Sequence, residues 1–234
     1  MHGYVHVLLN AGDFHFLWEC LRVLYMILWG TPAQPGSLCN LRELLNRKQV
    51  DKAVKVFSTG DEFLLHCFKA HLKARICTFF QVSTANDKIV HECSSQWLHD
   101  TAIKLLPHTV MPAKSDDPVY SLHRCFLHLG FLYVDLRNAI RWEKGPHIIR
   151  HWKLWLPRFI ATGCKNYATE SVHLLAGLCA DLPKHIAYIN THNRTVNVEG
   201  KPGRGKPIDQ MMEHYILYVQ FLGMICMYAC IAHI

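Results

Sequence analysis

The sequence is poor in charge: Asp, Glu, Lys and Arg make up only 18% of its 234 residues, while half of the chain is hydrophobic. This composition excludes an intrinsically disordered chain, because disordered chains bury too little apolar surface to fold. Internal repeats and low-complexity tracts are absent as well. The length is sufficient for one large domain or two small ones.

CxxC pairs and a secretory signal pattern are also missing. The ten cysteines are scattered, and the apolar run before Asn10 is too short for a signal peptide and has no basic residues ahead of it. We therefore expect reduced, mostly buried cysteines and an intracellular location, nuclear or cytoplasmic. The net charge of +7 is compatible with a polyanionic partner but does not require one.

Seventeen histidines suggest a zinc site, but no four ligands occur at zinc spacing. His147 and His151 lie four residues apart on an expected helix, yet the motif HIIRH lacks the glutamate of a metalloprotease. His123 lies near Cys125 without a metal-ligand spacing. A nucleophilic triad is likewise not recognisable. The sequence predicts no dedicated zinc site.

Strand-forming segments are rare, and helical spacing of apolar residues dominates. The run Tyr4–Leu9 is typical of one short buried strand, and a helix is expected between Asp13 and Gly30. Pro107 and Pro157 are expected to end two later helices. The expected helices after the first cover 38–47, 61–82, 97–106, 119–142, 147–156, 165–181 and 208 onward. The predicted fold class is mainly α, a helical domain with a short N-terminal strand.

The segment Glu199–Pro207 reads EGKPGRGKP and satisfies the pattern GxxxxGK. A phosphate-binding loop needs Ser or Thr after the lysine and backbone N–H groups inside the loop, and prolines occupy both kinds of position here. No nucleotide is therefore expected. The alternative is a mobile basic loop, in which Lys201, Arg204 and Lys206 contact nucleic-acid phosphates as point charges.

Several acidic residues are candidates for a two-metal site, which requires carboxylates that converge from separate elements. Asp13 follows the expected strand, Glu170 lies early in an expected helix, and Glu213 lies in the last helix one turn after Asp209. Asp13, His15 and Glu170 are the candidate ligands for such a metal. The alternative for each acid is a helix cap or a solvated surface position, and for Asp13 it is the helix cap.

Long strings of the sequence resemble a known family. They include GDFHFLWECLRVLY, VKVFSTGDEFLLHCFKAHL, IIRHWKLWLPRFIATGCKNYATE and PKHIAYINTHNRTVNVEGKPGRGKPIDQMMEHY. The chain resembles domain-of-unknown-function family 6589 of animals and fungi over about residues 11–216. The resemblance implies a transposon-derived protein with a ribonuclease-H-like core that helices interrupt, and with DNA as a partner.

By this analogy Asp13 is the second acid of the core, and the third is Glu170, with Glu213 as the alternative. Mg²⁺ or Mn²⁺ is the cofactor if the acidic site is intact. Longer members of the family carry an upstream segment with an Asp-Gln-Leu-Thr string, which is expected to supply the first acid. Only twelve residues precede Asp13 here. The resemblance therefore implies an N-terminally truncated, catalytically incomplete relative of a DNA transposase rather than an active enzyme.

The C-terminal segment departs from the family pattern. Residues 215–234 carry no charge apart from His233 and have about the length that spans a bilayer. We expect a partial family domain over 1–214, followed by an apolar helix that is a membrane anchor, a core helix or sequence without a selected role. The alternative function is a non-catalytic helical interaction module, with tail anchoring in a membrane as one variant of it.

Overall fold

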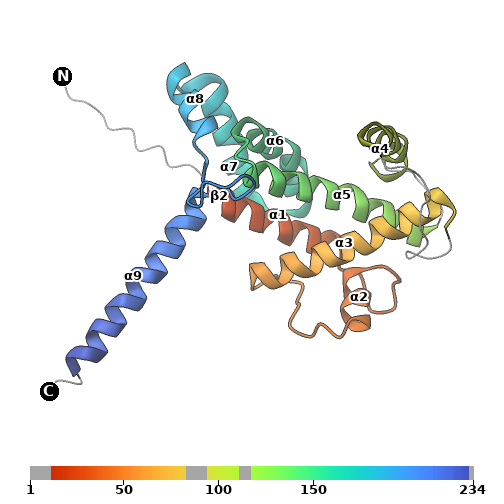
Figure 1. The fold of residues 1–234 in the computed structure, drawn as a ribbon, viewed down its shortest axis with the longest axis horizontal. Coiled ribbons are helices and arrows are strands. Elements are labelled where there is room, and N and C mark those ends of the chain that lie inside the picture. Colours follow the sequence, from red (N-terminus) through yellow and green to blue (C-terminus); the bar gives the residue numbers. More distant parts are fainter. Residues whose placement is uncertain (1–11, 83–93, 111–116, 232–234) are drawn as a thin grey trace. The chain divides into compact units, whose positions relative to one another are not determined.

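The computed structural model describes residues 12–82, 94–110 and 117–231 (Figure 1). The chain divides into two compact units. Unit 1 comprises Met1–Glu19 and Leu136–Ile234, and unit 2 comprises Cys20–Asp135. The predicted strand Tyr4–Leu9 lies outside the described residues.

Unit 2 contains most of α1 (Asp13–Leu28) and α5 (Pro118–Arg141), together with α2 (Leu38–Leu44), α3 (Phe57–Phe80) and α4 (Ser95–Val110). Ser37 begins α2 by accepting a hydrogen bond from the Asn40 backbone N–H at 3.2 Å, a favoured N-cap contact. The core of this unit is apolar and includes Leu21, Leu24, Leu64, Phe126 and Leu127.

Unit 1 contains α6 (Gly145–Thr162), α7 (Lys165–Ala176), the π-helix η1 (Gly177–Asp181), α8 (Lys184–His192) and α9 (Ile208–Ile231). Helix α6 packs against α7 and α8. From α1, Phe16 stacks on Trp152 of α6 with ring centroids 3.9 Å apart, and both side chains are fully buried. Such aromatic pairs contribute large apolar areas to a core.

The prediction of a mainly α chain is confirmed, whereas the predicted helix ends at Pro107 and Pro157 are wrong. Helix α4 continues past Pro107 to Val110, and α6 continues past Pro157 to Thr162. Trp155 and Phe159 are buried on either side of exposed Pro157, so the apolar face of α6 continues across it. Burial of that face outweighs the loss of one backbone hydrogen bond on the solvent side.

The described residues contain a single sheet, formed by β1 (Thr195–Val196) and β2 (Lys206–Pro207), which pair in antiparallel fashion. These residues therefore do not confirm a ribonuclease-H-like remnant. Among them, no helix has the length and apolarity needed to cross a membrane, so the anchor alternative gains no support. The side chains of α9 from Tyr215 to Val219 are exposed, so this stretch is not a core helix either.

Candidate functional site

The carboxylate of Asp13, the first residue of α1, lies inside unit 1 with the residue only 3% exposed. Arg194 donates to both of its oxygens, from Nε to Oδ2 at 2.7 Å and from Nη2 to Oδ1 at 2.8 Å. The indole Nε1 of Trp152 donates to Oδ1 at 2.9 Å. Both carboxylate oxygens are thus occupied by N–H donors in a fork geometry that favours an ion pair.

Arg194 lies between α8 and β1 and is itself 6% exposed. Its Nη1 donates to Asn190 Oδ1 at 3.2 Å, and its guanidinium carbon lies 5.9 Å from the centroid of the Trp152 ring. Burial raises the pKa of the Asp13 carboxyl, while the charge and hydrogen bonds of Arg194 oppose this effect by favouring the ionised form. We name Asp13, Arg194, Trp152 and Asn190 the acidic corner.

Asp209, and not Asp13, caps the start of α1. Its carboxylate accepts from the Phe14 backbone N–H at 3.0 and 3.1 Å and from the His15 backbone N–H at 3.2 Å. A Cβ on Gly12 would lie 2.0 Å from Asp209 Oδ2, so any larger residue here would displace the capping carboxylate. An anion at this position also interacts favourably with the helix dipole.

His15 bridges two carboxylates of α9. Its Nδ1 lies 3.1 Å from Asp209 Oδ2 and its Nε2 lies 3.1 Å from Glu213 Oε1. The His15 and Glu213 side chains are 49% and 42% exposed, so water screens this contact. Glu213 thus lies beside His15, which is two residues after Asp13 in the chain.

Glu170, the other candidate third acid, is exposed on α7. Asp13, His15 and Glu170, all in the described part of the chain, do not offer three ligand atoms within 4.8 Å of one another. Their roles as metal ligands stay predictions. The geometry explains why a metal would need rearrangement at Asp13, because its oxygens already accept three hydrogen bonds.

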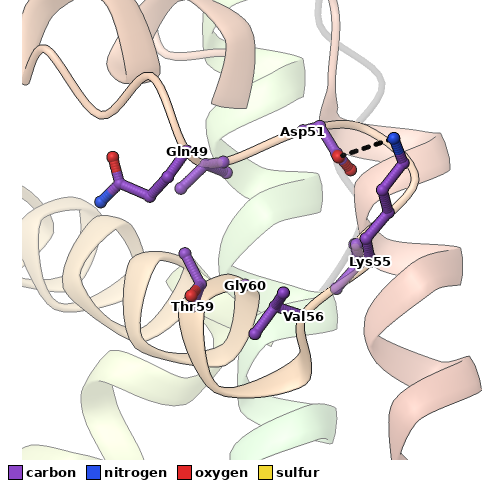
Figure 2. A pocket seen from close by; sticks show the side chains of 8 residues that line it. Gln49, Asp51, Lys55, Val56, Thr59 and Gly60 are labelled. Atoms are coloured by element: carbon purple, nitrogen blue, oxygen red, sulfur yellow. Dashed lines mark ion pairs between the residues drawn. The ribbon is translucent and has the colours of Figure 1, made fainter.

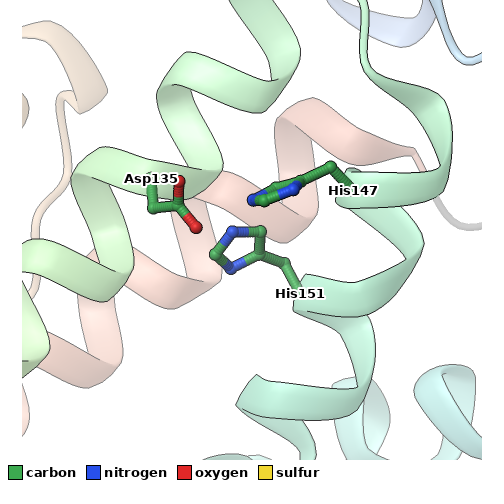
Figure 3. Close-up of side chains that lie close together, drawn as sticks. All are labelled: Asp135, His147 and His151. Carbon is green, nitrogen blue, oxygen red and sulfur yellow. The ribbon is translucent and has the colours of Figure 1, made fainter.

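His147 and His151 lie one turn apart on α6, with ring centroids separated by 5.2 Å (Figure 3). His151 is fully buried, and His147 is partly exposed. Asp135, also drawn in Figure 3, belongs to unit 2. Within the described residues of unit 1, this place offers two imidazoles, fewer than the four ligands of a structural zinc site.

The basic loop, residues 197–205 between β1 and β2, is docked on the C-terminal end of α5. The Gly205 backbone N–H donates to the Arg141 carbonyl at 3.0 Å, and Arg141 Nε donates to the Gly203 carbonyl at 3.4 Å. Asn197 Nδ2 donates to the Lys201 carbonyl at 2.9 Å. These bonds link the basic loop to α5 and to itself.

Two of the three predicted nucleic-acid contacts face solvent. Lys201 and Arg204 are exposed, and Lys206 is half-buried. Arg204 Nε lies 3.9 Å from Glu199 Oε2, a weak solvent-exposed pair. Lys201 and Lys206 make no ion pair within the part of the chain that the structure describes. Lys201 and Arg204 are therefore within reach of a polyanion, whereas Lys206 lies in β2 and is less accessible.

Unit 2 holds a histidine pair and a small pocket. His71 Nδ1 and His123 Nδ1 are 2.7 Å apart, a hydrogen bond in which one ring donates and the other accepts.

The pocket, of about 180 Å³, lies between the turn before α3 and the first turns of that helix (Figure 2). Asp51 and Lys55 form an ion pair at its rim, 4.0 Å apart. Its lining residues are Gln49, Val50, Asp51, Val54, Lys55, Val56, Thr59 and Gly60.

A family model described as a family of unknown function, DUF6589, matches residues 1–222. The chain belongs to this family. No curated protein and no solved structure matches it. The DUF6589 match includes the acidic corner, the Asp209 cap and the basic loop, and it ends within α9. The predicted domain boundary at residue 214 stays a prediction.

Sequence reasoning selected Asp13 in this DUF6589 chain but missed its partners. Trp152 and Arg194 lie 139 and 181 positions away along the chain. No local pattern marks either residue, since an arginine after a helix and a tryptophan on an apolar face are both common. The signal that could have found them is pairwise: a buried carboxylate requires a buried cation.

Proposed function

We propose that this DUF6589 chain is a catalytically incomplete, transposase-derived domain that binds nucleic acid without cleaving it. The main support for the missing catalysis is that both oxygens of the Asp13 carboxylate already accept hydrogen bonds. Two-metal catalysis requires carboxylate oxygens that are open to the ions. Moving the Asp13 carboxylate to a metal would leave the buried guanidinium of Arg194 without its counter-ion, which costs about 3–5 kcal/mol.

The basic loop supports the nucleic-acid part of the proposal. Lys201 and Arg204 are exposed on a loop whose path is fixed by hydrogen bonds to α5. Cations held in place lose less conformational freedom when they contact phosphates. The net charge of +7 adds a favourable long-range attraction for polyanions.

Thermal melting with a metal titration tests the catalytic part. Millimolar Mg²⁺ or Mn²⁺ is expected to leave the melting temperature of the full chain unchanged, because the oxygens of Asp13 already accept hydrogen bonds from Arg194 and Trp152. Asp13→Asn is expected to lower the melting temperature with or without metal. Asp181→Asn, the same change at an exposed acid of unit 1, is the control. It is expected to leave the melting temperature unchanged with and without metal. A metal-induced rise that Asp13→Asn abolishes would overturn the proposal.

Fluorescence anisotropy tests the binding part, with labelled DNA over a range of salt concentrations. The affinity is expected to fall with salt, because bound phosphates release counter-ions. Replacing Lys201, Arg204 and Lys206 by Gln is expected to reduce the salt slope by about 0.7–0.9 for each cation that contacts a phosphate. Absence of binding at low salt to single-stranded and to duplex DNA would refute this part.

The second candidate function is a helical protein-interaction module, and the surface of α9 favours it. Five consecutive apolar residues, Tyr215–Val219, are each more than half exposed. Contiguous exposed apolar residues of this kind mark interaction surfaces. Sedimentation of the full chain and of a variant with Ile216→Lys and Val219→Lys tests whether this surface mediates self-association. Equal self-association of the wild type and the variant would count against such a role.

A further inference from the structure

Trp142 lies directly after the last residue of α5, and 57% of its surface is exposed. Exposure of this extent is unusual for tryptophan, whose large apolar ring is highly buried on average. The indole lies against the basic loop: a Cβ on Gly203 would be 3.5 Å from Trp142 Cζ2 and 3.6 Å from Cε2. Gly203 has a φ of 72°, a conformation that glycine adopts readily.

The cations around this indole come from two segments. Arg141 and Lys144 flank it along the chain, and both are exposed. Lys201 and Arg204 lie on the basic loop, on either side of Gly203 in the chain. Glu143 and Glu199 are the carboxylates beside them, and Glu199 is paired with Arg204. The cations outnumber the acids by four to two.

Two hydrogen bonds hold the segments together before any ligand binds. The Gly205 N–H donates to the Arg141 carbonyl, and Arg141 Nε donates to the Gly203 carbonyl. A Cβ on Gly205 would lie 2.7 Å from the Ile140 carbonyl oxygen, so the loop approaches the backbone of α5 closely. The position of the indole relative to the loop is therefore set by the fold, which favours binding by pre-organisation.

We infer that Trp142, together with Arg141, Lys201 and Arg204, forms a binding site for single-stranded nucleic acid. An unpaired base stacks on the indole, and the phosphates next to it contact the cations. This combination of an aromatic platform and a cationic surface binds single strands with little sequence preference. A duplex keeps its bases stacked on each other, so it gains nothing from the indole. The inference rests on the proposed nucleic-acid binding and specifies its ligand.

Binding of two labelled probes to the full chain tests the inference: a single-stranded oligothymidine and a duplex of equal length. Trp142→Ala is expected to weaken binding of the single strand at least tenfold and to leave binding of the duplex unchanged. Trp142→Phe keeps an aromatic face and is expected to retain most of the affinity. Tyr188→Ala removes another exposed aromatic ring of unit 1 and is expected to change neither probe. Circular dichroism checks that each variant is folded.

The outcomes separate this inference from the proposed function. Equal single-strand affinity in the wild type, Trp142→Ala and Tyr188→Ala would overturn the inference while leaving nucleic-acid binding in place. Tighter binding of the duplex than of the single strand would have the same meaning. Absence of binding to both probes would remove the proposed function as well. Displacement of the single strand by poly-glutamate of equal charge, at equal concentration, would show attraction by charge alone and would contradict stacking.

Discussion

The acidic corner of unit 1 and the histidine pair of unit 2 are both polar contacts inside a helical unit, but the first joins opposite charges and the second joins two bases. Asp13 and Arg194 carry opposite charges that compensate each other within 2.7 Å. His71 and His123 are two bases 2.7 Å apart, and their hydrogen bond requires at least one neutral ring. The comparison teaches that residue types used in catalysis also form internal contacts. We expect the acidic corner and the histidine pair to respond differently to pH.

Removing one partner of the acidic corner is the largest perturbation. Arg194→Met is expected to destabilise unit 1 by about 3–5 kcal/mol, because Asp13 stays buried without a cation. Combining it with Asp13→Asn is expected to recover part of this loss, since no buried charge then remains. Urea unfolding measures both free energies. A loss below about 1 kcal/mol for the single variant would mean that water reaches the carboxylate.

The histidine pair is expected to weaken in acid. Burial, followed by the positive charge of a protonated His123, lowers the pKa of His71 to about 4, against the opposing effect of a hydrogen bond with the Gly36 backbone. The pKa of His123 is also lowered, first by burial and then by the charges of Arg75 and Arg124. The unfolded chain therefore binds more protons than the folded one between about pH 4 and the ordinary histidine pKa near 6.5. Stability is full above this window and falls as the pH decreases through it.

His71→Phe tests this pH dependence. The slope of unfolding free energy against pH, up to about 1.4 kcal/mol per pH unit for each proton taken up, is expected to decrease in this variant. His66→Gln is the matched control, because His66 lies on the same helix with its side chain 52% exposed. Urea unfolding between pH 7 and pH 4.5 gives the slopes. Identical slopes in the wild type and His71→Phe would show that the pair does not take up the protons.

The acidic corner also shows what sequence could and could not predict. Apolar periodicity predicted the helices around it, and the junction of Asp13 with an apolar helix marked that residue as unusual. The contacts of Asp13 and the cap by Asp209 depend on residues more than 130 positions away, and no spacing rule reaches that far. Pro157 was misjudged for a related reason, because burial of Trp155 and Phe159 outweighs the local effect of proline.

The Asp209 cap adjoins the acidic corner and is expected to matter less. Asp209→Ala leaves the Phe14 and His15 backbone N–H groups without their acceptor. The loss is expected to be about 1 kcal/mol, as for other N-cap residues, and Asp209→Asn is expected to retain much of the stability. Urea unfolding compares the two variants. Equal losses for Ala and Asn would point to the contact with His15, rather than the cap, as the source of stability.

Glu213→Gln gives the smallest expected effect and bears most directly on catalysis. Its carboxylate contacts His15 at 3.1 Å, but both side chains are more than 40% exposed, so the contact contributes at most about 1 kcal/mol. We therefore expect nearly wild-type stability and unchanged binding of nucleic acid. An incubation of the wild type with Mn²⁺ and labelled DNA is expected to yield no cleavage. Cleavage that Glu213→Gln abolishes while stability and binding persist would make this acid a catalytic one. The reactive carboxylates of unit 1 would then lie on α9 beside His15, and the acidic corner would remain structural.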